Sequence, residues 1–207
     1  TGALVRERGC KKVLLHYGGG SAVRSGLLDR VKDSLREAGL VRLYLGVESG
    51  SDAVLRAVNK GVTAPEMLTA GQRLVKAGFD LWTMVLIGLA GPGEKSRSHA
   101  LDTAALINAM GPRHLSALTY LPTPGTPLAR QAERGEFQLL DAREALEETR
   151  LLLESLQVSP LHFTSDHASN YLPLKGGLPE ERERLLALLD GALAGRQDVR
   201  PEFWRGL

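Results

Sequence analysis

The sequence predicts a single α/β domain in which strands alternate with helices. Apolar residues alternate or run together over 41–48, 80–88 and 114–121, and each stretch is followed by a turn and a segment with helical spacing. A fourth short apolar stretch, 12–17, leads in the same way into Gly18–Ser21 and a helix. Because strands that alternate with helices favour a parallel sheet, we expect about four parallel strands, outer helices and a carboxy-terminal helical cap.

Composition limits the classes of function. The 207 residues are 43% hydrophobic and 24% charged, which is enough for one sizeable core. The 26 Lys and Arg are interleaved with 24 Asp and Glu, so we expect no nucleic-acid partner. No apolar run approaches the roughly 20 residues of a membrane span, so we expect no membrane partner either. Cys10 is the single cysteine and can form no intrachain disulfide, which fits a cytoplasmic location.

The first unit of the chain is a strand, a glycine-rich loop and a helix. Residues 12–17 form the expected strand and Gly18–Ser21 the loop, and the helical spacing ends at Gly39. Three glycines would let a phosphate approach backbone N–H groups at the start of a helix. A purely structural loop is the other interpretation, and it is the one that we prefer.

The stretch GCKKVLLHYGGGSAVRSGLLDRVKDSLREAGL, within residues 7–40, is similar to the amino-terminal strand and helix of iron-containing alcohol dehydrogenases. This resemblance implies that Gly18, Gly19, Gly20 and Ser21 lie near the ribose of NAD or NADP. The family's second glycine-rich loop and its Asp and His metal ligands have no counterpart here. We therefore expect neither hydride transfer nor iron binding, and NAD(P) at most as a weak ligand.

The second unit places a carboxylate at the end of a strand. Glu48 ends the stretch 41–48, the small residues at 49–52 suit a turn and a helix cap, and helical spacing begins at Val54. Loops and helix amino termini converge at the carboxyl edge of a parallel sheet, and ligands bind there. Glu48 is therefore a candidate ligand-binding residue.

The remaining elements follow from the same signals. The strand at 114–121 ends in a proline-rich loop, 122–127, and a strand-like stretch at 161–163 leads into the polar loop 164–174. The acids and arginines of the helix at 141–157 are assigned to a solvated face. Helical spacing and capping residues predict helices at 65–78, 98–110, 141–157 and 178–194.

The stretch LYLGVESGSDAVLRAVNKG, followed in order by IGLAG, LPTPGTPL, RGEF and SDHASNYLPLKGGLP, resembles the radical S-adenosylmethionine (SAM) enzymes. The resemblance covers residues 41–207, implies a partial (half) βα barrel, and points to the subgroup similar to oxygen-independent coproporphyrinogen oxidase. In that family a Glu at the position of Glu48 contacts the SAM ribose, and a basic residue at the position of Lys60 approaches the SAM carboxylate. Ser49 belongs to the same motif and is included in the expected site.

The same resemblance assigns two further loops. Gly88 and Gly91 belong to the loop that passes beneath the SAM adenine, although a loop that merely requires glycine is an open alternative. Pro124 and Gly125 belong to the rim next to the substrate.

Asp166, His167 and Asn170 lie close together in the polar loop and have two interpretations. They could contact substrate, or they could serve Asx turns and capping, which we prefer. The histidines show no spacing typical of a zinc site, so we expect no metal ion.

Radical SAM enzymes hold a 4Fe–4S cluster through three cysteines of a CxxxCxxC loop, whereas this sequence has only Cys10. The cluster is therefore not expected here, and SAM binding is expected to be weak or vestigial. The parent activity is the reductive cleavage of SAM to a 5′-deoxyadenosyl radical. We predict a truncated or chimeric radical SAM-type protein that is not catalytic alone, in which residues 1–40 and 41–207 form one continuous globular domain.

A structural module without turnover is the alternative from a different class. A half barrel exposes two strand edges, and sheets tend to pair or cover such edges. We therefore consider a homo-oligomer that forms through the exposed edges. A weak NAD(P) binder through Gly18–Ser21 is the third possibility.

Overall fold

The computed structural model describes residues 7, 25–39 and 41–205. The expected strand at 12–17, the loop Gly18–Ser21 and Cys10 lie outside the described residues. The predictions made for them therefore stay predictions.

Five strands form one sheet in the described part of the chain, in the order β1-β2-β3-β4-β5. The first four pair in parallel, and the fifth is antiparallel to the fourth. The strands are β1 (Arg42–Glu48), β2 (Asp80–Ile87), β3 (His114–Thr119), β4 (Leu161–Thr164) and β5 (Lys175–Leu178). The predicted strands at 41–48, 80–88 and 114–121, the strand-like 161–163 and the α/β class with a partial barrel are thereby confirmed.

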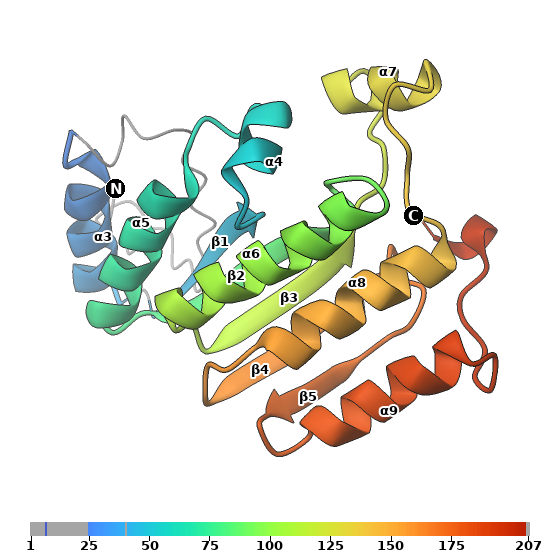
Figure 1. The fold of residues 1–207 in the computed structure, drawn as a ribbon. Coiled ribbons are helices and arrows are strands. Elements are labelled where there is room, and N and C mark those ends of the chain that lie inside the picture. The colour runs from blue at the N-terminus through green and yellow to red at the C-terminus, as the bar shows by residue number, and fades with distance from the viewer. Residues whose placement is uncertain (1–6, 8–24, 40, 206–207) are drawn as a thin grey trace.

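A layer of helices covers one face of this sheet (Figure 1). α6 (Glu94–Met110) packs against α8 (Ala142–Ser155), and α8 packs against α9 (Arg182–Leu193). α5 (Ala64–Lys76) continues the layer on the other side of α6. The last predicted helix thus lies beside α8, in the same layer as the other outer helices.

Short helices stand at the end of the sheet where β1, β2 and β3 finish (Figure 1). They are α4 (Asp52–Ala57), directly after β1, and α7 (Pro127–Glu133), after β3. α3 (Leu27–Glu37) lies at the β1 end of the sheet, and a 3₁₀ turn, η1 (Glu202–Trp204), comes near the carboxyl end of the chain. The carboxyl ends of the strands are therefore framed by α4 and α7.

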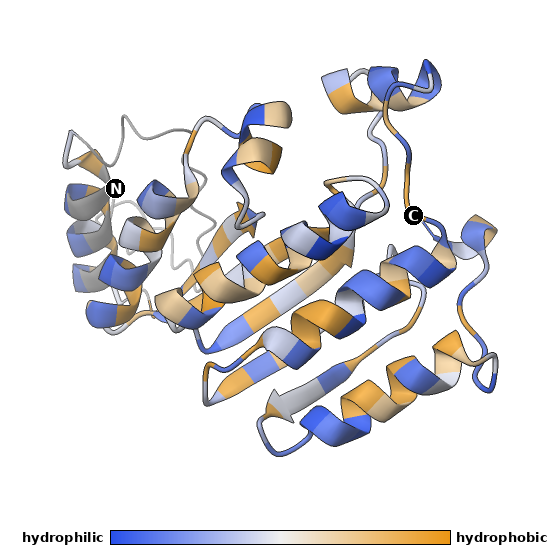
Figure 2. Cartoon of the chain, in the orientation of Figure 1, coloured by the Kyte–Doolittle hydropathy of each residue, from blue (hydrophilic) through white to orange (hydrophobic). Residues whose placement is uncertain are grey.

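The sheet has one buried and one open face. Leu43, Leu45 and Val47 of β1 are buried and alternate with less buried residues, and β2 and β3 show the same alternation. The buried side chains belong to the main apolar core, and Figure 2 shows apolar colour along both the strands and the helices that cover them. The other face carries partly exposed side chains, as expected where a barrel does not close over it.

Two capping boxes fix where helices begin. In α5, the Glu66 N–H donates to the Thr63 hydroxyl at 3.4 Å and the Glu66 carboxylate accepts the Thr63 N–H at 3.0 Å. In α8, Asp141 and Glu144 exchange the equivalent bonds at 2.8 and 3.0 Å. Such reciprocal bonds satisfy backbone donors that the first turn of a helix leaves unpaired. They explain why the predicted starts of both helices are confirmed.

Two helices depart from the sequence prediction near the carboxyl end of the sheet. α6 begins at Glu94 rather than Ser98, because Gly93, at φ 76°, forms the N-cap directly after the loop of residues 88–92 that follows β2 (the glycine loop). α7 is not among the predicted helices, because its first residue, Pro127, belongs to the proline-rich segment 122–127, which predicts a stiff loop. Thr126 accepts the Ala129 N–H and caps this helix.

β5 is a strand that the sequence analysis also misses. Gly176 and Gly177 form its centre, and glycine is depleted in strands. The prediction that the last helix begins at Leu178 is wrong, because Leu178 ends β5 and α9 begins at Arg182.

Side chains from the start of α9 occupy backbone groups of β5. The Gly177 N–H donates to the Glu181 carboxylate at 2.7 Å, and the Glu181 N–H donates to the Gly177 carbonyl at 2.8 Å. The Arg184 guanidinium donates to the Lys175 carbonyl at 2.8 Å. The bond from Gly177 and the neighbouring Arg184 lower the pKa of Glu181. Oligomerisation through strand edges stays a prediction, but this edge offers fewer backbone groups to a partner strand.

Candidate functional site

Glu48 and Lys60 meet at the carboxyl end of β1. The Lys60 ammonium donates to Glu48 Oε1 at 2.8 Å, and the two side chains are 26% and 25% exposed. Glu48 has a φ of 62°, which side-chain-bearing residues rarely adopt, and the pairing of β1 with β2 shifts between Gly46 and Glu48. The irregular end of the strand thus turns a charge pair toward solvent.

Gly46 makes room for this pair, and the sequence analysis did not single it out. A Cβ at Gly46 would lie 2.6 Å from Glu48 Oε1 and 3.4 Å from Lys60 Nζ. The Glu48 carboxylate therefore folds back over the strand at the one residue without a side chain. A glycine two positions before a strand-end carboxylate is the signal that could have predicted this arrangement.

Ser49 braces the turn between β1 and α4. Its side chain is buried, and its hydroxyl accepts the Ser51 N–H at 3.0 Å. The next residue, Gly50, donates its N–H to the Thr103 hydroxyl of α6 at 3.0 Å, and a Cβ there would collide with the backbone of Asp102. The structure therefore places Ser49 beside Glu48 with its hydroxyl engaged within the turn.

Gly88 and Gly91 lie in the loop that follows β2, as predicted, and both have a positive φ, 85° and 77°. Only glycine adopts such angles at no steric cost. The Gly91 N–H donates to the Gly88 carbonyl at 3.2 Å, which closes a tight turn. The Gly88 N–H donates to Glu148 Oε1 at 2.8 Å, so this amide is engaged with α8.

Glu148 is the centre of a buried polar cluster on the helix side of the sheet. In addition to Gly88, its carboxylate accepts the Ser96 hydroxyl and lies 3.0 Å from His99 Nδ1. The side chains of Glu148 and His99 are 0% and 2% exposed. A carboxylate has about four lone-pair sites, so it can accept all three groups.

The expectation that the acids of 141–157 form a solvated face is wrong for Glu148. Periodicity could have revealed it, because Glu148 lies three residues after the buried Ala145 and four before the buried Leu152. An acid at an apolar position of a helix predicts a buried partner.

An apolar groove of about 430 Å³ lies between α4, the glycine loop, the first turns of α6 and α7. Its apolar wall includes Val54, Leu89 and Leu128, which form a second core cluster separate from the main one. Phe137 and His99 also line it. The volume lies within the usual range for small-molecule sites.

Pro124 and Gly125 are exposed in the loop before α7. The Arg130 guanidinium donates to the Gly125 carbonyl at 2.5 Å, and the Thr126 hydroxyl donates to the Thr123 carbonyl at 2.8 Å. These bonds tie the loop to the helix that carries Leu128 into the groove. The loop is therefore joined to the groove through α7.

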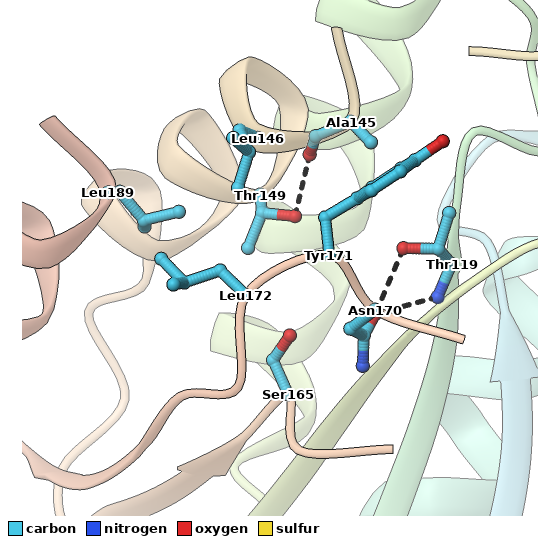
Figure 3. A pocket seen from close by; sticks show the side chains of 9 residues that line it. All are labelled: Thr119, Ala145, Leu146, Thr149, Ser165, Asn170, Tyr171, Leu172 and Leu189. Carbon is cyan, nitrogen blue, oxygen red and sulfur yellow. Dashed lines mark hydrogen bonds between the residues drawn. The ribbon is translucent and has the colours of Figure 1, made fainter. Parts of the chain in front are cut away.

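Asn170 has a different environment from Asp166 and His167. It is buried, accepts the Thr119 N–H at 2.8 Å and the Thr119 hydroxyl at 2.9 Å, and donates to the Ala117 carbonyl at 3.0 Å. Figure 3 shows it turned toward Thr119. Both residues line a cavity of about 10 Å³, close to the size of one water. Asp166 and His167 are exposed. The geometry of Asn170 matches the structural interpretation of this residue.

Aromatic and charged side chains line the amino-terminal end of the open face. Trp82 stacks on His114 with ring centroids 4.3 Å apart, and Asp80 lies 2.7 Å from Arg42 and 3.0 Å from His114. Burial lowers the pKa of His114 more than Asp80 raises it. This end of the face is opposite to the one that carries Glu48. Among the residues that the structure describes, no three His, Cys, Asp or Glu side chains are placed to hold a metal ion.

Comparison with known proteins points to one superfamily. The model of the radical SAM superfamily matches residues 20–105. The tRNA-2-methylthio-N(6)-dimethylallyladenosine synthases of Shewanella sp. (strain W3-18-1) and Legionella pneumophila (strain Corby) are 33% and 31% identical over 119 residues, which is 56% of this chain. These residues make up 24% and 26% of the two relatives, so the chain spans about a quarter of their length.

A solved structure supports the fold. The archaeal Methanocaldococcus infernus Elp3 with an amino-terminal deletion matches with a TM-score of 0.56 at 18% identity, over 82% of this chain and 40% of that chain. Within the described residues, no helix is both long and apolar enough to cross a lipid bilayer.

The superfamily match begins at residue 20 and so includes part of the segment 7–40. The alcohol dehydrogenase resemblance of that segment and the chimera stay predictions. Over residues 20–105 the chain is similar to the radical SAM superfamily.

Proposed function

We propose that this chain is the SAM-binding part of a radical SAM-type protein and that it does not cleave SAM by itself. The observation that carries the proposal is the Glu48–Lys60 pair, 2.8 Å apart and partly exposed at the carboxyl end of β1. Ligands of α/β proteins bind at this end of the strands. The position agrees with the site that the family resemblance implies.

The chemistry of the donor set fits SAM. The ribose hydroxyls of SAM can donate to Glu48, and its carboxylate can accept from Lys60. Hydrogen bonds to a charged group contribute about 1.5–3 kcal/mol each. The flat adenine suits the apolar groove beside Leu89 and Ala90 of the glycine loop. Bound SAM would supply a carbon–sulfur bond that one-electron reduction cleaves, while Glu48 and Lys60 hold and orient the ligand.

The residues of this chain do not fit a 4Fe–4S cluster. Such a cluster is held by several cysteine thiolates, and the sequence contains Cys10 alone. We therefore derive no step through a cluster.

Calorimetric titration with SAM tests the binding proposal. We expect weak binding to the unmodified chain and about tenfold weaker binding to Glu48→Ala, because one charge-assisted hydrogen bond is lost. Glu147→Ala is the matched control, because Glu147 is also a partly exposed acid, paired with Arg143 at 2.9 Å. Equal affinities for SAM in Glu48→Ala and the unmodified chain would remove Glu48 from the site.

Anaerobic reconstitution with iron and sulfide tests the second part of the proposal. We expect no visible absorption of an iron–sulfur cluster and no 5′-deoxyadenosine after addition of dithionite and SAM. Oligomerisation would have to gather Cys10 from several chains to change this result. Formation of 5′-deoxyadenosine would contradict the proposal.

Two parents are candidates for the longer protein. The resemblance of 41–207 favours a coproporphyrinogen oxidase-like enzyme, whereas the names of the curated relatives favour an enzyme that modifies tRNA. We infer that this chain does not itself bind nucleic acid, because its positive charges are interleaved with acids. A filter-binding assay with bulk tRNA tests the inference, and saturable binding at physiological salt would overturn it. We also infer a cytoplasmic location from the single cysteine.

Three further proposals concern the whole chain. Residues 7–40 would derive from an alcohol dehydrogenase and continue into 41–207 as one domain, and fluorescence titration with NADPH tests whether Gly18–Ser21 retain weak affinity. The chain would also form homo-oligomers through strand edges. Light scattering after size-exclusion chromatography measures that state directly, and a monomer at high concentration would exclude it.

A further inference from the structure

We propose that Glu148 is a positioning residue that holds the glycine loop and His99 in the arrangement that receives the adenine of SAM. This inference rests on the proposed SAM-binding function. Glu148 lies on α8 and contacts neither Glu48 nor the groove directly. It acts through Gly88 and His99.

The contacts of Glu148 join three elements that are far apart in the sequence. One carboxylate connects the end of β2 at Gly88, the first turns of α6 at Ser96 and His99, and α8 itself. All three side chains are buried, with Glu148 at 0% and His99 at 2% exposed. A hydrogen bond to a charged group inside a protein is stronger than one to a neutral group, and removing it leaves buried donors unpaired. The carboxylate is therefore a strong constraint on the loop.

The first effect of this constraint is on the wall of the groove that the glycine loop forms. Gly88 has a φ of 85°, and its N–H points to Glu148, so the chain turns there before Leu89 and Ala90 reach the groove. A Cβ at Gly88 would lie 3.2 Å from Cγ of Leu140, so the Leu140 side chain closes the other side of the turn. With the amide of Gly88 fixed, Leu89 and Ala90 have little freedom to leave the groove wall.

His99 provides the second link between Glu148 and the groove. Its Nδ1 lies 3.0 Å from the carboxylate, and His99 is one of the residues that line the groove. Its other ring nitrogen, Nε2, is buried with no hydrogen-bond partner within the described part of the chain. Glu148 therefore holds a residue that belongs to both the polar cluster and the lining of the groove.

Substitutions can separate the acceptor from the charge and the size of this side chain. Glu148→Met keeps a side chain of similar length but accepts nothing from Gly88 or Ser96. Glu148→Gln keeps one carbonyl for the Gly88 N–H, while its NH₂ group can donate to the Ser96 hydroxyl, which is able to turn and accept. Glu147→Met is the control on the exposed face of the same helix, where Glu147 is 50% exposed.

The experiment measures hydrogen exchange of the Gly88 amide by NMR and SAM affinity by calorimetry in the same variants. We expect faster exchange at Gly88 and about tenfold weaker SAM binding in Glu148→Met, the effect of one lost hydrogen bond. Glu148→Gln should restore both values to within about threefold of the unmodified chain. Glu147→Met should change neither. The loop effect is measured without ligand, so it does not depend on SAM binding.

The outcomes distinguish this inference from the proposed function. Unchanged exchange at Gly88 in Glu148→Met would overturn the inference whether or not SAM binds. Faster exchange with unchanged SAM affinity would also overturn it, because the loop would then not serve the ligand. If the unmodified chain binds no SAM, the proposed function fails and with it the adenine role. If Glu148→Met does not fold, Glu148→Gln decides, since an affinity about tenfold weaker there would contradict the acceptor role.

Discussion

Two carboxylates at the same end of the sheet have opposite environments. Glu48 lies on the open face, is 25% exposed and has one cationic partner, Lys60. Glu148 lies between the sheet and the helices, is 0% exposed and contacts three groups from two other elements. A partly exposed pair can exchange its partner for a ligand at small cost, whereas a buried carboxylate with several donors holds the structure. Glu48 is therefore the carboxylate that is available to a ligand, and Glu148 is the one that holds the surrounding structure.

The backbone conformations of Glu48 and Glu148 differ as their environments do. Glu48 has a φ of 62°, an angle that side-chain-bearing residues adopt only where surrounding structure imposes it. Glu148 lies in the middle of a regular helix with a complete capping box at its start. The strained residue is the one that the family resemblance assigns to the SAM ribose, and strain of this kind gathers at binding sites.

The largest effect should come from removing the buried carboxylate. Glu148→Met should lower the free energy of unfolding by about 2–6 kcal/mol, because the buried donors of Gly88 and Ser96 lose their acceptor and each unpaired donor costs about 1–3 kcal/mol. Urea denaturation followed by circular dichroism measures this loss. Glu147→Met should change stability by less than about 0.5 kcal/mol, because it alters an exposed position. Similar losses for the two variants would mean that the contacts of Glu148 do not stabilise the fold.

Sequence periodicity predicts the strand ends at Glu48 and Gly88 but not the buried environment of Glu148. Alternation in 41–48 and 80–88 predicts the strands. Because ligands bind at the carboxyl ends of parallel strands, the ends of these two strands then locate Glu48 and Gly88. The helix at 141–157 was also predicted, but its acids were assigned together to the solvated face. The position of Glu148 between Ala145 and Leu152 carries the missing information, although its partners Gly88 and His99 are 60 and 49 residues away. Local patterns cannot supply contacts of that range.

Other features had little or no local signal. β5 is centred on Gly176 and Gly177, and its pairing with β4 depends on tertiary contacts rather than on strand propensity. α7 begins inside a proline-rich loop because Thr126 caps it, which a capping search over that loop could have found. The space at Gly46 depends on how Glu48 and Lys60 fold back over the strand, so it requires coordinates.

A smaller effect, on SAM affinity, should appear when a side chain fills the space at Gly46 of β1. In Gly46→Ala, the new Cβ would lie 2.6 Å from Glu48 Oε1, so the carboxylate must swing away. The atoms displaced are the ends of flexible side chains, and alanine restricts the unfolded chain more than glycine does. We therefore expect unchanged or slightly higher stability and about tenfold weaker SAM binding, the loss of one charge-assisted contact. Thermal unfolding and calorimetry measure the two quantities, and unchanged SAM affinity would show that the carboxylate is not used where it now lies.

Backbone strain at Glu48 should produce the next smaller effect, a difference in stability between two variants. Glu48→Gly and Glu48→Ala remove the same carboxylate, but only glycine adopts a φ of 62° without penalty. The glycine variant should be about 1 kcal/mol more stable than the alanine variant. At Glu147, in the middle of α8, the order should reverse, because glycine is about 1 kcal/mol worse than alanine inside a helix. The same order at both positions would exclude strain at Glu48.

The smallest effect should be the contribution of the Glu48–Lys60 pair to stability without ligand. The two groups are 2.8 Å apart but about a quarter exposed, so water screens their attraction and the long lysine chain loses freedom when it pairs. A double-mutant cycle with Glu48→Gln and Lys60→Met should give a coupling below about 1 kcal/mol, and added salt should reduce it. The same cycle measured in SAM affinity should give a larger coupling. Glu48 and Lys60 would then hold the ribose and the carboxylate of one ligand together. A coupling in stability as large as the effect of Glu148→Met would mean that the pair is structural. SAM would then have to displace that pair before it could bind.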